Sequence, residues 1–328
     1  MRVASFVFFL ISLLCLSCSP DLQKIRGNVF GTTYGIQYFD ELPNARLERA
    51  VDSTYRVINE SLSTYLPNSV ISQINHNQDV VVDDLFVKVF EASNVVFRET
   101  NGRFDPTIGA LVNIWDFGPE GATRQVDSTQ IIELMSHVGF NRLQLNEYIL
   151  QKPHESVFID FNAIAKGFAV DQIAELLSSF GYADYLVEIG GEIRTSGMNR
   201  SKNSTWKIGV DKPNFEGNQS VIAAIELGHA SLATSGVYRH FKVNEQGERY
   251  AHIIDSKTGF PSRTDILSVS VIAKECMFAD AYATAIQSMN SAEAKAFLSE
   301  HPELKVMLIV GQSDGSMDLQ YFNGFPKD

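Results

Sequence analysis

The chain has 328 residues, of which 45% are apolar, and a formal net charge of −12 at pH 7. This length and composition allow a large buried core in one large domain or in two modest ones, and they exclude a disordered protein. No block of basic residues interrupts the acidic balance, so the chain would repel the phosphate backbone of DNA or RNA. We therefore expect no nucleic-acid partner.

The N-terminus has the features of an export signal. One arginine, Arg2, precedes a mainly apolar run without charged residues from Val3 to about Leu16, and small residues then lead to Cys18. The run is shorter than the roughly 20 residues that a membrane-spanning helix needs. No later stretch approaches that length, so the mature protein is not expected to cross a bilayer.

The end of this segment, "LSCS", resembles a bacterial lipoprotein signal, in which the cysteine becomes the lipidated first residue of the mature chain. The match is imperfect because Cys15 stands where such signals usually carry leucine, and simple secretion or an uncleaved anchor are the alternatives. We expect residues 1–18 to be a signal peptide with its lipidation site at Cys18, and residues 25–328 to be the functional domain. The protein would then be exported and lipid-anchored to a bacterial membrane, facing the periplasm or the cell exterior.

The first half of the domain is mainly helical in its pattern. Residues 44–66 carry apolar side chains at helical spacing, and residues 84–102 repeat this pattern with Gly102 as a C-terminal stop. Residues 128–139 predict a third helix, and the alternation in residues 142–151 predicts a hairpin.

The second half is richer in strands. It opens with a predicted strand at 156–160, a loop at 161–167 and a helix at 168–181 that Gly181 closes. The later predicted strands are 185–197, interrupted by paired glycines, 206–213, 220–227, 230–236, 250–259 and 265–273, followed by helices 277–289 and 291–301 and a hairpin at 305–322. Without repeats or linkers, this order predicts a single α+β domain with a mainly antiparallel sheet and packed helices.

The segment "FADAYATA", residues 278–285, combines a carboxylate and a hydroxyl on a predicted apolar helix. Asp280 and Thr284 are four residues apart and therefore lie on one face, and the neighbouring alanines leave room around them. Hard cations such as Mg²⁺ prefer such oxygen ligands and can take their remaining ligands from water and a substrate phosphate. The alternative is that Asp280 caps the helix while Thr284 bonds back to a carbonyl.

The segment "DFNAIAKG", residues 160–167, lies between a predicted strand and a predicted helix. Backbone N–H groups at such a position favour an anion, and Lys166 would add a positive charge. The spacing is not that of a nucleotide-binding Walker loop, and "GGEIRTSG" lacks the glycine pattern of a dinucleotide fold. The alternative is that Lys166 is a solvated surface lysine.

Two further segments carry candidate site residues. In "GRFDPTIGALVNIWDFGP", the aromatic residues Phe104, Trp115 and Phe117 stand near Asp105, as core residues or as a platform for a flat ring whose edge Asp105 contacts. In "YAHIIDSKTG", His252 on a predicted strand is either a structural residue or a general acid or base with a pKa near neutrality. Serine-hydrolase chemistry is poorly supported because no Gly-x-Ser-x-Gly elbow occurs.

Nine segments in this order together resemble the ApbE family of FAD:protein FMN transferases: "VFGTTYGIQ", "LSTYLPNSVISQIN", "NGRFDPTIGALVNIWDFGP", "FIDFNAIAKGFAVDQIAELL", "VEIGGEIRTSG", "WKIGVDKP", "SLATSGVYRHF", "AHIIDSKTGFPS" and "FADAYATA". The resemblance runs from about Gly27 to Met289. It implies a single T-fold-related domain and a magnesium-dependent reaction. FAD is split at its diphosphate, FMN is esterified to a Thr or Ser hydroxyl of a target flavoprotein, and AMP leaves.

The resemblance also implies a set of site residues. Asp280 and Thr284 would be side-chain ligands of Mg²⁺, joined by a backbone carbonyl from "NAIAKG" that we assign to Ala165. His252 would exchange a proton during the reaction and, with the metal pair, forms the expected catalytic set. The residues expected to contact FAD are Phe30, Tyr65, Arg103, Phe104, Asp105, Asn162, Lys166, His252 and Ile254.

Two alternatives to the transferase arise from the same segments. A site that activates the diphosphate could pass FMN to water, which would make the protein an FAD-binding or FAD-cleaving envelope lipoprotein. A non-enzymatic binding module is the third possibility. By family resemblance, the expected acceptor of a transferase is a flavoprotein subunit of a membrane redox complex.

Overall fold

The computed structural model describes residues 20–120, 126–214, 220–238, 241–243 and 249–327. The expected signal peptide and Cys18 lie outside the described residues, so lipidation stays a prediction. Within the described part of the chain, no helix is both long enough and apolar enough to span a bilayer.

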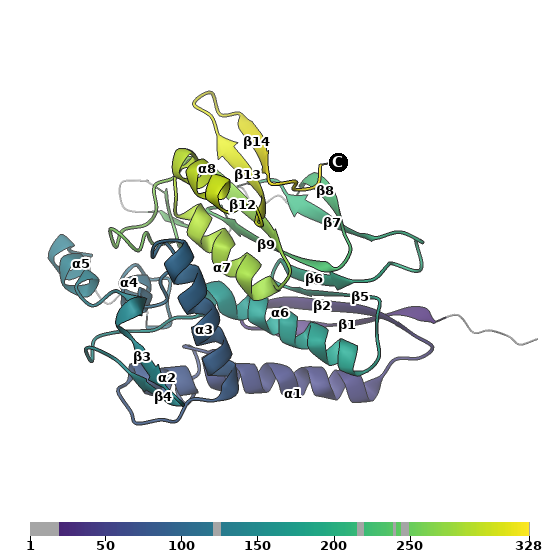
Figure 1. Ribbon diagram of the computed structural model, residues 1–328, viewed down its shortest axis with the longest axis horizontal. Coiled ribbons are helices and arrows are strands. Elements are labelled where there is room, and N and C mark those ends of the chain that lie inside the picture. Colours follow the sequence, from purple (N-terminus) through teal and green to yellow (C-terminus); the bar gives the residue numbers. More distant parts are fainter. Residues whose placement is uncertain (1–19, 121–125, 215–219, 239–240, 244–248, 328) are drawn as a thin grey trace, which may run out of the picture.

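An eight-stranded sheet forms the centre of the domain (Figure 1). Every neighbouring pair of its strands is antiparallel. The strand order is β1 (Asp21–Val29), β2 (Thr32–Asp40), β5 (Tyr185–Ile189), β6 (Glu192–Ser196), β9 (Ala230–Gly236), β12 (Ile266–Ala273), β13 (Lys305–Gly311) and β14 (Met317–Phe322). The α+β class with a mainly antiparallel sheet is thereby confirmed.

Helices cover one face of this sheet, and their apolar sides join the main hydrophobic core (Figure 1). In α1, buried residues recur at helical spacing on the side that faces the sheet. The helices of this layer are α1 (Ala45–Leu62), α3 (Asp84–Glu99), α6 (Asn162–Ser179), α7 (Cys276–Gln287) and α8 (Ser291–Glu300).

The opposite face of the sheet carries a second, smaller core. The hairpin of β7 (Trp206–Asp211) and β8 (Val221–Leu227) packs there against side chains such as Leu186 of β5 and Ile309 of β13. Because successive strand residues point to opposite faces, Leu186 contacts this hairpin while Val187 faces the helices.

Short elements complete the domain, and Figure 1 shows those that it labels beside the α3 end of the helix layer. They are α2 (Val70–Asn75), α4 (Gly109–Ile114), α5 (Ser128–Met135), η1 (Phe140–Arg142), β3 (Gln144–Asn146), β4 (Ile149–Gln151), β10 (Phe241–Val243) and β11 (Arg249–Ala251). The Asn75 side chain ties α2 to the extended segment before α6, since it donates to and accepts from the Ile159 backbone at 2.8 Å each.

Two predictions for the segment before α6 are wrong. The predicted strand at 156–160 pairs only through an isolated bridge between Phe158 and Ile108. The predicted loop at 161–167 is the start of α6, which begins at Asn162. Asp160 favours this start because its carboxylate accepts a hydrogen bond of 2.7 Å from the Asn162 N–H, one of the orphan donors of the first turn.

The predicted strand at 250–259 is also too long. β11 ends at Ala251, so His252 follows a strand instead of lying in one. The chain turns after Ile254 because the Asp255 carbonyl accepts hydrogen bonds from the N–H groups of Thr258 at 3.2 Å and Gly259 at 2.8 Å. Gly259 has a φ of 77°, which glycine adopts without steric cost.

Candidate active site

Helix α7 is fixed against α6 by a buried carboxylate and by a close approach of backbones. Asp171 of α6 accepts hydrogen bonds of 2.9 Å from the N–H groups of Cys276 and Met277, and it pairs with Arg194 of β6 at 2.6 Å. A Cβ atom on Gly167 would lie 2.4 Å from the Cys276 carbonyl oxygen. Only a glycine therefore allows the two helices to cross at this distance.

The crossing brings Asp280 onto the backbone of α6. Asp280 is 4% exposed, and its Oδ2 accepts a hydrogen bond of 3.0 Å from the Gly167 N–H. Its Oδ1 accepts no hydrogen bond from any residue that the structure describes. The alternative that Asp280 caps α7 is wrong, because Asp171 binds the first N–H groups of that helix.

The same contact bears on the expected carbonyl ligand. In a regular helix the N–H of Gly167 points to the carbonyl of Ala163, four residues earlier, whereas the carbonyl of Ala165 points to residue 169. Because Asp280 accepts a hydrogen bond from that N–H, regular helix geometry would bring its carboxylate nearer to the carbonyl of Ala163 than to that of Ala165. Ala163 therefore joins Ala165 as a candidate for the backbone ligand, and the assignment to Ala165 stays a prediction.

Thr284 lies one turn along α7 from Asp280, as the spacing predicted. Its Oγ1 lies 3.3 Å from the Oγ of Ser235 on β9, with either atom able to donate. The Thr284 hydroxyl therefore has a partner on the sheet, and no hydrogen bond back to its own helix is present. Both residues are half-buried.

Lys166 is not a solvated surface lysine. Its Nζ lies 2.7 Å from Oε1 of Glu192, which starts β6 and is 2% exposed. Burial is the first cause that raises the pKa of the Cys276 thiol, and Asp171, Asp280 and Glu192 add to it while Lys166 opposes them. The charged groups of α6, β6 and α7 thus gather around this buried thiol.

These donors fit a hard divalent cation. The site offers a buried carboxylate with one oxygen left for a ligand, a hydroxyl one turn away and a nearby helix carbonyl. Within the described ranges, no three His, Cys, Asp or Glu side chains gather in a way that could hold a metal. A cation here would accordingly need oxygens from water or a substrate, which is the usual coordination of Mg²⁺.

An aromatic wall stands near the start of α6. The Tyr65 side chain is 60% exposed, and its hydroxyl donates to the Phe117 carbonyl at 3.4 Å. The Phe117 ring lies edge-on to His252 at 6.2 Å between centroids and to Tyr250 at 5.8 Å. Tyr65, Phe117 and His252, from three separate segments, are thus brought together.

Asp160 lies beside this wall and was not singled out from the sequence. Partial burial, and then the nearby carboxylate of Asp160, raise the pKa of the Tyr65 phenol. Asp160 also accepts a hydrogen bond of 3.2 Å from the Asn162 side chain, which fixes that amide at the start of α6. The signal that could have found Asp160 is its position two residues before the first helical residue, where a carboxylate binds orphan N–H groups.

The expected aromatic group around Asp105 is divided in the structure. Phe104 is 3% exposed and belongs to the main core, whereas Trp115 donates to the Gly259 carbonyl at 2.8 Å and contacts Tyr250. The interpretation as a core residue therefore holds for Phe104, and the alternative of a ring platform does not include it.

Asp105 has a structural role, because its carboxylate accepts hydrogen bonds from other residues of the chain. One carboxylate oxygen accepts hydrogen bonds from the Thr107 N–H at 2.8 Å and from its hydroxyl at 2.6 Å, and the other accepts from the Phe140 N–H at 3.3 Å. Burial, the largest cause, raises the pKa of the Asp105 carboxyl against these hydrogen bonds. Its expected contact with FAD stays a prediction.

The structure also places three other residues that we expected to contact FAD. Phe30 lies in the turn between β1 and β2 with a φ of 50°, edge-on to Tyr55 at 5.8 Å. Arg103 pairs with Asp255 at 3.2 Å and with Glu293 of α8 at 2.9 Å. Ile254 is 3% exposed in a small cluster with Leu111 and Ile131.

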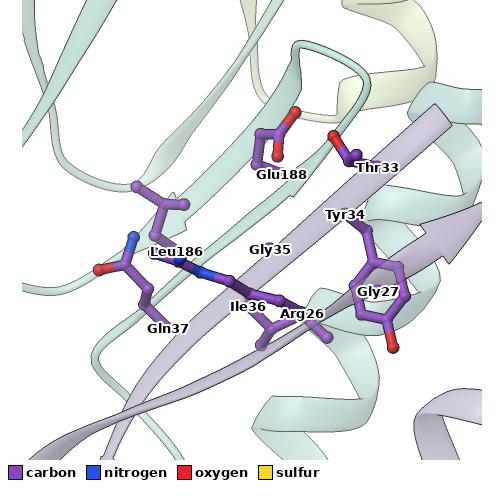
Figure 2. A pocket seen from close by; sticks show the side chains of 9 residues that line it. All are labelled: Arg26, Gly27, Thr33, Tyr34, Gly35, Ile36, Gln37, Leu186 and Glu188. Carbon is purple, nitrogen blue, oxygen red and sulfur yellow. The ribbon is translucent and has the colours of Figure 1, made fainter.

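A separate pocket of about 400 Å³ lies away from these residues, over β1, β2 and β5. Figure 2 shows Arg26, Gln37, Leu186 and Glu188 around Gly35, which leaves the floor of the pocket without a side chain. None of the predicted site residues lines it, so it is not the site assembled by α6 and α7.

The fold as a whole matches flavin transferases of known structure. The flavin transferase ApbE from Vibrio cholerae superposes with a TM-score of 0.84 at 32% identity, over 93% of this chain and 98% of that one. The apo flavinyl transferase ApbE of Pseudomonas stutzeri gives a TM-score of 0.83 at 27% identity, over 94% and 96% of the two chains. The class that the fold defines is therefore the flavin transferases.

Within that class the family is settled by sequence. The ApbE family model matches residues 30–308, and the chain belongs to the ApbE family. An FAD:protein FMN transferase of Vibrio cholerae serotype O1 is 34% identical over 93% of each chain. One of Haemophilus influenzae is 32% identical over 95% of this chain and 94% of its own. The resemblance expected from the nine sequence segments is confirmed.

Proposed function

We propose that this protein transfers FMN from FAD to a Thr or Ser hydroxyl of a flavoprotein and releases AMP, with Mg²⁺ held by Asp280 and Thr284. Membership of the ApbE family and the relatives named FAD:protein FMN transferase support the flavin transfer. The observation that supports the metal assignment is the Asp280 carboxylate. It is buried at the α6 backbone with one oxygen left for a ligand, one turn from the Thr284 hydroxyl.

The reaction exchanges the phosphoanhydride bond of FAD for a phosphate ester bond to the acceptor. The acceptor hydroxyl oxygen forms a bond to the FMN phosphorus, and the bond from that phosphorus to the oxygen shared with AMP breaks. The hydroxyl loses its proton and AMP leaves with the bridging oxygen. Mg²⁺ would neutralise the charge that develops on the diphosphate oxygens, held by Asp280, Thr284 and the carbonyl of Ala163 or Ala165.

The other residues of the site bind and orient the substrate. Lys166, anchored by Glu192, presents a cation close to the metal ligands, where it stabilises negative charge on the diphosphate. Tyr65, which is exposed, and Phe117, which is half-buried, offer an aromatic surface for a ring of FAD. His252 stands at that surface as the group that exchanges a proton with the acceptor hydroxyl or with AMP.

The test combines the chain lacking residues 1–18 with FAD, Mg²⁺ and a candidate acceptor domain, and looks for a covalent FMN adduct by mass spectrometry. Asp280→Ala should abolish the adduct and Thr284→Ala should weaken it. Asp314→Ala, which removes an exposed carboxylate in the β13–β14 turn, is the matched control. Full activity in the Asp280 variant would refute the metal assignment, and free FMN with AMP in place of an adduct would favour the FAD-cleaving alternative.

We further propose that the chain is exported, lipidated on Cys18 and anchored to a bacterial membrane. The acceptor would be a flavoprotein subunit of a membrane redox complex there. The sequence of residues 1–18 supports this proposal. Metabolic labelling with a radioactive fatty acid tests it, because the label should enter the wild-type chain and not the Cys18→Ser variant.

A further inference from the structure

The hydroxyl of Ser235 has a place in the site that the family comparison does not assign. It projects from β9 to within 3.3 Å of the Thr284 hydroxyl, and within the described part of the chain it makes no other side-chain hydrogen bond. Ser235 as a residue is half-buried. A role for Ser235 in this site rests on the proposed function, because it requires Thr284 to be a ligand of the cation.

Proton counting decides which hydroxyl donates. Each hydroxyl has one proton and two lone pairs. If the Thr284 oxygen turns a lone pair to a cation, its proton must point away, and Ser235 is the acceptor in reach. Ser235 then keeps its own proton for a third group.

We propose that Ser235 positions Thr284 as a metal ligand and donates its own hydrogen bond to a diphosphate oxygen of the substrate. Asp280 and Thr284 are about 6 Å apart along α7, at 1.5 Å per residue, so a shared cation lies between their oxygens. Phosphate oxygens bound to Mg²⁺ lie about 2.1 Å from the metal. An oxygen at that distance on the β9 side of the cation lies within hydrogen-bond reach of Ser235.

The neighbouring residue of β9 offers a matched control. Thr234 pairs with Ser270 of β12 through their hydroxyls at 2.9 Å. Because successive residues of a strand point to opposite faces, Thr234 points away from α7 when Ser235 points toward it. Loss of the Ser270 hydroxyl removes a hydrogen bond of the same kind from the other side of the same sheet.

The experiment measures binding of ADP, a nucleoside diphosphate that cannot donate FMN, to the full chain in detergent by titration calorimetry with and without Mg²⁺. Ser235→Ala should weaken binding in Mg²⁺ by about 10-fold to 100-fold, the usual effect of losing a hydrogen bond to a charged group. Ser235→Thr, which keeps the hydroxyl, should stay within about threefold of the wild type. Ser270→Ala should bind ADP as the wild type does, and thermal unfolding of each variant confirms that it is folded.

The outcomes separate this inference from the proposed function. If Ser235→Ala binds ADP in Mg²⁺ as tightly as the wild type, while Asp280→Ala forms no FMN adduct, the role of Ser235 is refuted and the transferase stands. Equal weakening in Ser235→Ala and Ser270→Ala would also refute it, because a general effect on the sheet would then explain both. If Mg²⁺ does not improve ADP binding to the wild type, the metal assignment and the role of Ser235 fail together.

Discussion

Gly167→Ala should damage both the stability and the activity of the protein, because the α6 and α7 backbones leave no space for a side chain there. The new Cβ would lie 2.4 Å from the Cys276 carbonyl oxygen and 2.7 Å from the Met277 Cα, and both contacts are backbone atoms that no rotamer change can move. Ordinary contact begins near 3.4 Å, so the start of α7 must move by about 1 Å. Such a movement stretches the 3.0 Å hydrogen bond between Gly167 and Asp280 beyond hydrogen-bond range.

The magnitude combines three effects. Overpacking costs about 1–3 kcal/mol, and loss of a hydrogen bond to a charged group costs about 1.5–3 kcal/mol. The higher helix propensity of alanine returns about 1 kcal/mol. We expect a net loss of about 1.5–5 kcal/mol in the free energy of unfolding, and a decrease in FMN transfer of at least about tenfold because Asp280 is displaced.

Urea unfolding and the mass-spectrometric adduct assay measure the two effects. Gly228→Ala is the control, because a Cβ there meets no atom within 4 Å and the backbone has no positive φ. If Gly167→Ala unfolds at the wild-type urea concentration and transfers FMN at the wild-type rate, the close crossing does not hold the metal ligand in place, and the reasoning is refuted.

Three further predictions concern single side chains. Lys166→Met should lower the free energy of unfolding, measured in urea, by about 3 kcal/mol, because buried Glu192 loses its ammonium partner. The double variant Lys166→Met with Glu192→Gln should recover part of this loss. Equal stability of the single and double variants would contradict the prediction. Burial raises the pKa of Asp171 to about 6, so the stability that its protonation contributes is present below about pH 4 and is lost as pH rises toward 6. Asp171→Asn should therefore flatten the dependence of the free energy of unfolding on pH, measured by urea unfolding at several pH values. An unchanged pH dependence would assign it to another group. Tyr65→Ala should change the free energy of unfolding by no more than about 0.5 kcal/mol, because the side chain is largely exposed. The same variant should bind FAD more weakly in a flavin fluorescence titration. Unchanged FAD affinity would remove Tyr65 from the site.

The helix face of Asp280 and Thr284 was predictable because helical periodicity alone places residues four apart together. The start of α6 was not, because Gly167 in "NAIAKG" looks like a helix breaker. A glycine is needed at position 167 because α6 crosses Cys276 closely, and Cys276 belongs to a segment more than 100 residues later. Local sequence carries no signal for a tertiary contact of this kind, and the same holds for the choice between Ala163 and Ala165.

The partners of the site residues were missed for a related reason. Glu192 and Asp171 were not singled out, since a glutamate after paired glycines and an aspartate in a helix are common residues in common places, and Ser235 was considered only for serine-hydrolase chemistry. Their roles arise only because the antiparallel order sets β6 beside β9, and because α6 and α7 cross over those strands. Topology therefore assembles the second half of the site from residues that no local pattern marks.

The charges of the assembled site support the proposal that a cation is needed for a substrate of this class. Asp280 and Glu192 carry two negative charges against the single positive charge of Lys166, and the whole chain has a net charge of −12. A doubly negative diphosphate would be repelled by such a site, whereas a divalent cation between it and Asp280 reverses the sign of the local field. Metal and FAD should consequently bind with positive coupling, each raising the affinity of the other by the same factor. Calorimetric titration of Mg²⁺ with and without a bound diphosphate nucleotide measures that factor, and a factor of one would show that the carboxylate at the α6 crossing does not bind the metal that the substrate uses.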